Sequence, residues 1–326
     1  MRAAADEAPA ARLLFQPTGE VAITASSRET VYREGRDYVA DPATGVVTLT
    51  AEAAIPFTDV RELYRALDDE YTIGHKAGDP DKGLYWAEGH HFADLQVEAS
   101  YDHASTWRGH QPTYQGGALP ETAQRLASGR PLAVSVLGDS ISAGANASGR
   151  TGVSPHMPPY PYLFAGELER RFGGRVTLTN HAIGGKRVRH ALEVVEAVIA
   201  DRPDLVLVAY GMNDAGATLV DEYAATVGRV IDRIRTAGPR TEFILVASML
   251  GNPQWQATPP EAFFAFRDAL RLLCADRIIL ADMTQLWADL LAVKAYHDLT
   301  GNGVNHPNDF GHRLYAQVLV DLIVEP

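Results

Sequence analysis

The second half of the chain alternates short, continuous apolar runs with longer segments in which apolar residues recur at helical spacing. Continuous runs of about four to eight apolar residues are typical of strands that are buried on both faces. Strands that alternate with helices predict a doubly wound, five-stranded parallel sheet of the α/β class. The predicted strands cover residues 130–137, 175–180, 204–210, 241–249 and 277–281.

The first third of the chain has a different pattern. Segments 20–26, 30–33 and 45–50 alternate or cluster β-branched residues, and turn residues separate these segments. Such a pattern is typical of β structure. With a boundary near residues 111–129, we predict a β-rich accessory domain over residues 1–115 and the α/β domain over residues 116–326.

Three predicted strands lead into residues that are suited to catalysis. The first ends at Ser140 within Gly-Asp-Ser, the second at Gly185 within a Gly-Gly pair, and the third at Asn213 within Gly-Met-Asn-Asp. The carboxyl ends of parallel strands meet at one edge of a sheet, so we expect these three residues to converge. A serine on such a turn is a candidate nucleophile, although a helix cap is the alternative for the same residue.

Acyl transfer from a serine also needs a base and donors for the developing oxyanion. His306 is the candidate base, because imidazole titrates near neutral pH, with an unperturbed pKa of about 6.5. The backbone N–H groups of Ser140 and Gly185 and the carboxamide of Asn213 would form the oxyanion hole. We expect this chemistry to need no cofactor and no metal ion.

Taken in order, these blocks and the late His-Pro pair resemble the SGNH (GDSL-type) hydrolases, over roughly residues 131–326. The resemblance implies a flavodoxin-like SGNH fold and a carboxylic ester hydrolase with an acyl-enzyme mechanism. In that family a proline and an asparagine normally follow the catalytic histidine, and a helix then begins. His306 matches this order, whereas His312 has the Asp-x-x-His spacing of the family but is followed by no proline.

The catalytic acid is where the chain departs from the family pattern. The usual aspartate, three residues before the histidine, is Gly303 here, and the nearest analogue is Asn302. An asparagine can hold the imidazole tautomer but cannot neutralise an imidazolium. We favour Asp298 as the acid, because a loop that is one residue longer can fold back on itself. Asp309, and a dyad of serine and histidine alone, are the alternatives.

Composition and charge limit the partners of the protein. The chain has 326 residues, of which 46% are hydrophobic, and this is ample for two cores. Its net charge of −12 argues against nucleic acids and anionic membrane surfaces. The single cysteine, Cys274, excludes an intrachain disulfide. With no apolar run of about 18 residues and no signal core, we expect a cytoplasmic protein as given, although a chain trimmed of its signal would look the same.

Two other motifs receive no catalytic role from the sequence. Asn146-Ala-Ser148 fits a glycosylation sequon, but without a secretory signal we assign it no function. His90 and His91 lack a spaced partner for a metal site, so we interpret them as a surface pair.

These features together predict a serine esterase that hydrolyses short-chain acyl esters. By resemblance, an acetyl ester of a carbohydrate is the leading substrate class. An acyltransferase or thioesterase on the same site is one alternative, distinguished by the molecule that accepts the acyl group. A catalytically degenerate carbohydrate-binding protein is the other, and Ser140-dependent turnover of p-nitrophenyl acetate would exclude it.

Overall fold

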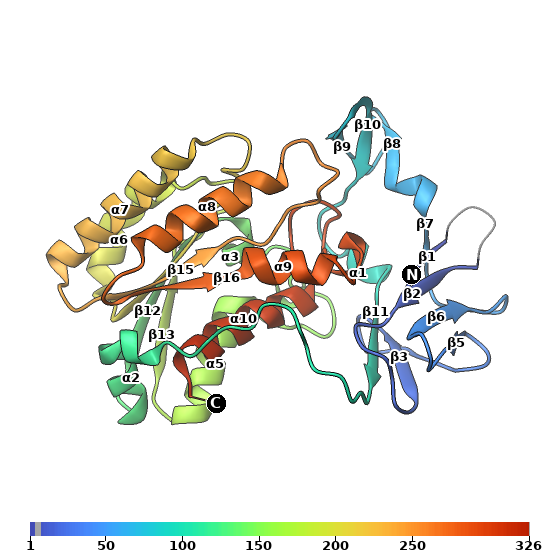
Figure 1. Ribbon diagram of the computed structural model, residues 1–326, viewed down its shortest axis with the longest axis horizontal. Helices are drawn as coiled ribbons and strands as arrows, with labels where there is room; N and C mark the ends of the chain where they lie inside the picture. The colour runs from blue at the N-terminus through green and yellow to red at the C-terminus, as the bar shows by residue number, and fades with distance from the viewer. Residues whose placement is uncertain (4–7, 326) are drawn as a thin grey trace.

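The computed structural model describes residues 1–3 and 8–325, and it shows an α/β part beside a β-rich N-terminal part (Figure 1). Within these residues the α/β part contains a parallel sheet of five strands in the order β13-β12-β14-β15-β16. The predicted fold class is therefore confirmed. The strands are β12 (Leu132–Gly138), β13 (Val176–Asn180), β14 (Leu205–Ala209), β15 (Glu242–Ala247) and β16 (Ile278–Asp282).

Helices cover both faces of this sheet, as right-handed crossovers between parallel strands require (Figure 1). Helices α6 (His190–Asp201), α7 (Val220–Ala237) and α8 (Pro260–Leu273) pack side by side on one face. Helices α5 (Tyr160–Phe172) and α10 (Asp309–Ile323) pack together on the other. Helix α7 buries one apolar stripe, which includes Tyr223, Val227 and Val230.

Strands β14 and β15 are buried along their whole lengths, which explains their continuous apolar sequences. The edge strand β13 is only half-buried and carries two threonines. Burial of this sheet between two helical layers forms the main core, and it holds the carboxyl ends of the strands in fixed positions.

The described residues of the N-terminal part form three small sheets, with strand orders β5-β6-β2-β1-β7, β8-β10-β9 and β11-β3-β4. A second core lies within this part and includes Val21, Ile23 and Tyr38. The elements are β1 (Arg2–Ala3), β2 (Ala10–Arg12), β3 (Val21–Ala25), β4 (Val31–Tyr32), β5 (Tyr38–Ala40), β6 (Val46–Leu49), β7 (Thr58–Asp59), η1 (Val60–Leu63), β8 (Tyr64–Ala66), β9 (Thr72–Lys76), β10 (Asp79–Tyr85), α1 (His91–Asp94) and β11 (Val97–Tyr101).

The region in which we predicted the domain boundary contains regular structure. It holds a 3₁₀ helix, η2 (Gly116–Ala118), followed by α2 (Pro120–Ala127). The buried carboxylate of Glu242 accepts the N–H groups of Glu121 and Thr122, both at 2.8 Å, and so caps α2 from the central sheet. The change from β to α/β structure therefore falls between β11 and η2.

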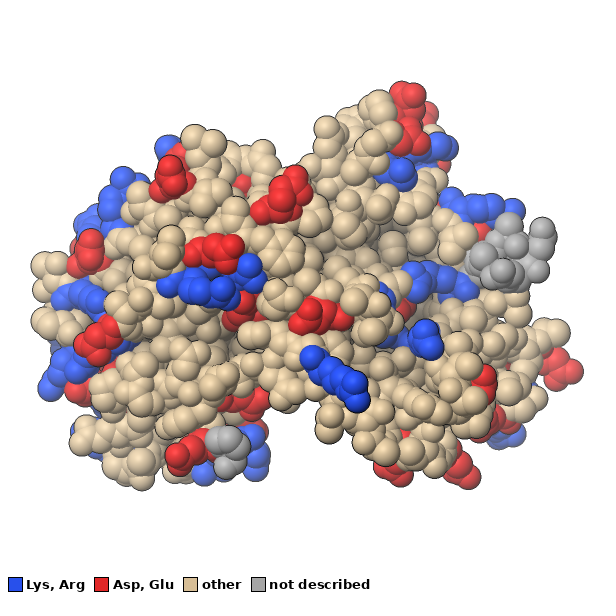
Figure 2. All heavy atoms as spheres, viewed as in Figure 1, with Lys and Arg blue, Asp and Glu red and all other residues tan. Residues whose placement is uncertain are grey.

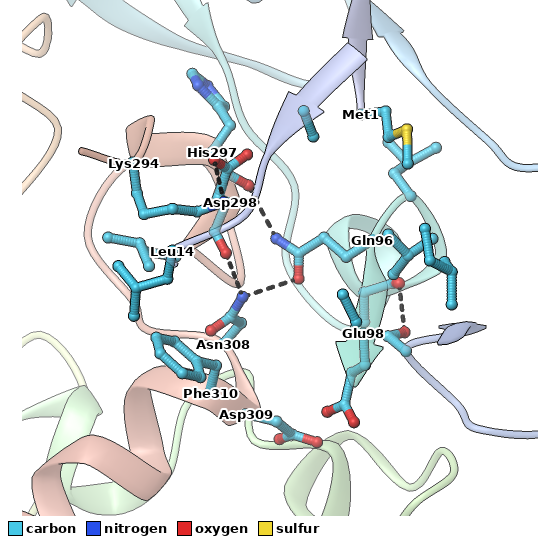
Figure 3. Close-up of a pocket in the computed structure, with 18 of the residues that line it drawn as sticks. Met1, Leu14, Gln96, Glu98, Lys294, His297, Asp298, Asn308, Asp309 and Phe310 are labelled. Atoms are coloured by element: carbon cyan, nitrogen blue, oxygen red, sulfur yellow. Dashed lines mark hydrogen bonds and ion pairs between the residues drawn. The ribbon is translucent and has the colours of Figure 1, made fainter. Parts of the chain in front are cut away.

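Two segments of the N-terminal part contact the loop that precedes α10. Ala87, just after β10, donates its N–H to the carbonyl oxygen of Asn302 at 3.3 Å. Gln96 donates through Nε2 to the carbonyl oxygen of His297 at 3.1 Å, and Asn308 donates through Nδ2 to Gln96 Oε1 at 3.1 Å (Figure 3). The N-terminal part therefore helps to shape the loop that carries His306.

A cavity of about 650 Å³ lies where the two parts meet (Figure 3). Apolar side chains such as Leu14 and Phe310 line it, together with charged groups that have partners. Glu98 pairs with Arg313 at 3.1 Å, and Asp298 pairs with Lys294 at 3.2 Å. Ser140 is not among the lining residues.

The remaining elements of the α/β part are short helices and one medium helix. They are α3 (Ser140–Ala143), α4 (Ser148–Thr151), α9 (Met283–Leu291) and η3 (Tyr296–Asp298). Over the described ranges, the structure has no helix that is both long and apolar enough to cross a bilayer.

Candidate active site

Ser140 lies at the carboxyl end of β12, where the chain turns directly into α3. Asp139 caps this helix, because its carboxylate accepts the N–H of Ile141 at 3.0 Å. The turn requires a glycine at 138, since a Cβ there would lie 2.4 Å from Ser142 Oγ and 3.0 Å from the carbonyl oxygen of Ala209. The serine is thus held rigidly at the edge of the sheet, with 8% of its surface exposed.

His306 approaches Ser140 from the loop between η3 and α10. Its Nε2 lies 2.8 Å from Ser140 Oγ, which is hydrogen-bond distance for a nucleophile and its base. Asn302 shapes the loop, because its Oδ1 accepts the backbone N–H groups of Val304, Asn305 and His306 at 3.0–3.1 Å. The structure therefore brings together the predicted nucleophile and the predicted base.

His312 lies in α10, buried, and does not contact Ser140. Its Nε2 is 3.1 Å from the carbonyl oxygen of Ala145, and its Nδ1 is 3.4 Å from the backbone N–H of Tyr160. These contacts tie the segment after α3 to the last helix. The position of His312 supports a structural role.

Three polar groups surround the other imidazole nitrogen of His306. Asn146 Oδ1 lies 2.7 Å from His306 Nδ1, Asn302 Nδ2 lies 3.0 Å from it, and Glu88 Oε2 lies 4.0 Å from it. Asn146 and Glu88 were not predicted from the sequence. Asn146 comes from the segment after α3, and Glu88 comes from the N-terminal part.

The structure does not bring Asp298 to the histidine, so our expectation for its position was wrong. Its carboxylate pairs with Lys294 at 3.2 Å and with Arg2 at 3.6 Å, on the side of the cavity between the two parts. The loop before His306 does turn back on itself, but it turns around the side chain of Asn302 and not toward Asp298. Asp309 is also occupied elsewhere, because its Oδ1 accepts the N–H of Ser148 at 2.8 Å.

Besides Ser140, the predicted oxyanion residues are Gly185 and Asn213, which lie in two loops that are bonded to each other. Gly185 has φ +74°, and a Cβ on the adjacent Gly184 would lie 3.7 Å from the Cβ of Ser140. Asn213 donates through Nδ2 to the carbonyl oxygen of Lys186 at 3.0 Å, which leaves one amide hydrogen for another acceptor. The structure therefore places Gly184 beside Ser140, with Gly185 next in the same loop and Asn213 joined to that loop.

Burial shifts the pKa values of two groups near Ser140. Burial lowers the pKa of His306 to about 4, and the nearby His312 adds to this lowering. The imidazole is therefore neutral at pH 7, as a general base must be. Burial also raises the pKa of Asp139 to about 7, against the opposing effect of its hydrogen bond from Ile141.

Neither the sequon nor the histidine pair has the surroundings of a glycan or metal site. Asn146 is 8% exposed and is hydrogen-bonded inside the site. His90 Nδ1 contacts Asp94 at 2.6 Å, and His91 contacts the hydroxyl of Tyr85. Among the described residues, no cluster of three or more His, Cys, Asp or Glu side chains is arranged to hold a metal ion.

Comparison with solved structures gives proteins with the same fold. A two-domain esterase (CEX) active on acetylated mannans, co-crystallised with mannopentaose, is 20% identical with a TM-score of 0.51. That match covers 65% of this chain and 54% of the other, so the chain matches about half the length of that esterase. A variant of Axe2, an acetyl-xylooligosaccharide esterase from Geobacillus stearothermophilus, is 20% identical with a TM-score of 0.51, over 60% of this chain and 95% of the other.

At this identity the two structures establish the fold alone. No curated protein matches the sequence. The GDSL-like lipase/acylhydrolase family, however, matches residues 136–314, which is more than half of the chain and includes Ser140 and His306. The protein therefore belongs to the GDSL-like lipase/acylhydrolase family.

Proposed function

We propose that the protein is a serine esterase that removes short acyl groups, acetyl above all, from a carbohydrate. The observation that carries the proposal is the 2.8 Å contact between Ser140 Oγ and His306 Nε2, in which both residues are less than one tenth exposed. A buried serine and a neutral imidazole at this distance are suited to nucleophilic attack on an ester carbonyl.

In the proposed reaction, Ser140 Oγ attacks the acyl carbon and its proton moves to His306 Nε2. The carbonyl oxygen becomes negative and is stabilised by the N–H groups of Ser140 and Gly185 and the free amide hydrogen of Asn213. The imidazolium then gives its proton to the departing alcohol as the ester bond breaks. Water, deprotonated by the same nitrogen, releases the acid and restores the serine.

Two features of the surface support a neutral, hydroxyl-rich substrate. On the face shown in Figure 2, Lys and Arg side chains are interspersed with Asp and Glu and do not form one charged patch. In the segment that leads to Glu88, the backbone N–H of Trp86 donates to the carbonyl oxygen of Tyr71. The Tyr71 ring, 43% exposed, stacks on His91. Exposed aromatic rings of this kind offer apolar area to a sugar ring.

The two solved structures with the same fold support the same substrate class. One acts on acetylated mannans, and the other is an acetyl-xylooligosaccharide esterase. The mannan esterase has two domains, and this chain likewise has an N-terminal part beside its α/β part. The N-terminal part reaches the histidine loop through the hydrogen bond from Ala87 to Asn302, and we propose that it contacts the alcohol portion of the substrate.

The test is a comparison of wild type, Ser140→Ala and Ser142→Ala on p-nitrophenyl acetate, butyrate and decanoate, and on acetylated manno- and xylo-oligosaccharides. Ser142 is a matched control, because it is buried in the same short helix but contacts Tyr160. We expect acetate release from the oligosaccharides, a preference for acetate over decanoate, and activity that is lost only in Ser140→Ala. Preference for decanoate, or transfer of acetyl to an added alcohol in place of hydrolysis, would contradict the proposal.

A further inference from the structure

We propose that Asn146 replaces the missing catalytic acid as the positioning residue for His306, holding the imidazole with its hydrogen on Nδ1 so that Nε2 is free to accept the proton of Ser140. The inference deepens the proposed esterase function and rests on it. The evidence is the set of acceptors that bind the amide hydrogens of Asn146 and Asn302 around His306 Nδ1.

The orientation of the Asn146 amide is determined by two carbonyl groups. Its Nδ2 donates to the carbonyl oxygen of Gly89 at 2.8 Å and to that of Gly301 at 2.9 Å. Both amide hydrogens are thereby used, and Oδ1 is left facing His306 Nδ1 at 2.7 Å. A rotated amide would place its oxygen against two carbonyl oxygens, which is unfavourable in a buried site.

The second amide near Nδ1 has other acceptors within reach. The Asn302 oxygen accepts three backbone N–H groups, so its orientation is also determined. Its Nδ2 donates to Asn305 Oδ1 at 2.8 Å. Burial raises the pKa of Glu88, and the Asn302 side chain opposes this rise by hydrogen bonding. One hydrogen of Asn302 therefore has another acceptor, and the second has two candidate acceptors, the Glu88 carboxylate and His306 Nδ1, which lies 3.0 Å from Nδ2. The shorter contact at Nδ1, 2.7 Å from the fixed oxygen of Asn146, decides between them.

One arrangement satisfies all of these groups. Nδ1 of His306 carries the hydrogen and donates it to Asn146 Oδ1. Nε2 then presents its lone pair to the hydroxyl of Ser140, which is the state a general base needs. The opposite tautomer would bring the lone pair of Nδ1 against Asn146 Oδ1 at 2.7 Å.

The same contacts explain why an amide occupies this position. A carboxylate at 146 has no hydrogens to donate, so it would face the carbonyl oxygens of Gly89 and Gly301 unpaired. Asparagine holds the histidine and also joins the nucleophile segment, the histidine loop and the N-terminal part. An asparagine orients the histidine of papain-like proteases in a comparable arrangement.

The first experiment compares wild type, Asn146→Ala, Asn146→Asp and Asn252→Ala by steady-state kinetics on p-nitrophenyl acetate from pH 4 to 9, with thermal unfolding of each. Asn252 is a matched control, because it is also buried and donates to the histidine loop, at Gly303 O (2.9 Å), without contacting His306. Asn146→Ala should lower kcat at least about tenfold at pH 7.5 and change KM little. Asn252→Ala should lower the unfolding temperature and leave the shape of the pH profile unchanged.

The pH profile separates a positioning role from a structural one. The other ionisable groups facing His306 are Glu88, 4.0 Å from Nδ1, and His312. Asn146→Asp adds a negative charge at Nδ1, so the acidic limb of its kcat/KM profile should move up by about one pH unit or more. An unchanged limb, or kcat in Asn146→Ala within about twofold of wild type, would overturn the inference.

A second measurement does not depend on the variants folding. The full chain is labelled with ¹⁵N-histidine, and the signals of His306 are assigned by their loss in His306→Gln. At pH 7 the ¹⁵N chemical shifts of His306 should show a protonated Nδ1 and an unprotonated Nε2. Protonation at Nε2 would overturn the inference. Failure of the esterase proposal gives a different result, because Ser140→Ala would then keep its esterase activity. If activity depends on Ser140 and Glu88→Gln loses more than Asn146→Ala, Glu88 is the partner and the inference is wrong.

Discussion

The pH dependence of turnover follows directly from the burial of His306. Because burial lowers its pKa to about 4, the base stays neutral over most of the acidic range. At pH 5.5 a group with a pKa of 4 is about 97% neutral, whereas one with the unperturbed value of 6.5 is about 9% neutral. We therefore expect kcat/KM at pH 5.5 to be nearly equal to that at pH 8, instead of about tenfold lower.

The assay is kcat/KM for a neutral ester, measured by acid release between pH 3.5 and 8. Enzyme returned from each pH to 7.5 should regain full activity, which separates titration from acid unfolding. The rate should fall below about pH 5 with a slope of one. A midpoint near 6.5, the value that the sequence alone suggests, would refute the link between burial and protonation.

Three further predictions concern neighbouring groups. His306→Ala should lose about 10²–10⁴-fold in kcat, whereas His312→Ala should mainly lower stability, by about 1–3 kcal/mol in chemical denaturation, through its buried contact with Ala145. Asp298→Asn should stay within a few-fold of wild-type kcat and cost on the order of 1 kcal/mol of stability, since it leaves Lys294 unpaired; a loss of several hundredfold would make Asp298 the acid. Folded Asp139 keeps its proton up to a pKa of about 7 while the unfolded chain releases it near 3.8, so stability falls as pH rises through that window. The unfolding temperature of Asp139→Asn relative to that of wild type should therefore increase from pH 4 to 7. A difference between the two proteins that stays constant over this range would contradict the prediction.

Much of the α/β part was predictable, because its physical cause is local. Runs such as Leu205–Ala209 are apolar throughout since both faces of the strand are covered. The place of Ser140 follows from the same pattern, because parallel strands bring their carboxyl ends to one edge.

The surroundings of the histidine were not predictable in the same way. The path of residues 299–306 depends on three backbone hydrogen bonds to the side chain of Asn302, and spacing from the histidine does not reveal them. Asn146 is 160 positions from His306 in the chain, and its oxygen meets the ring only after Gly89 and Gly301 have oriented its amide. The one available signal, an asparagine shortly after the nucleophile, was interpreted as a sequon without function.

The N-terminal part shows a related limit. Its β character was readable from β-branched segments, but its division into three small sheets depends on pairing between distant strands such as β3 and β11. The same applies to Glu88, whose carboxylate lies 4.0 Å from His306 next to the hydrogen bond between Ala87 and Asn302.

The central claim is that Ser140 is the nucleophile and that His306 activates it. The most direct test is reaction with a phosphonate ester of p-nitrophenol, followed by intact-protein and peptide mass spectrometry. We predict one covalent adduct per chain, on Ser140 Oγ, which is absent in Ser140→Ala and forms at least about 100-fold more slowly in His306→Ala. Loss of activity with the adduct on another residue, or an unchanged rate of labelling in His306→Ala, would contradict the account.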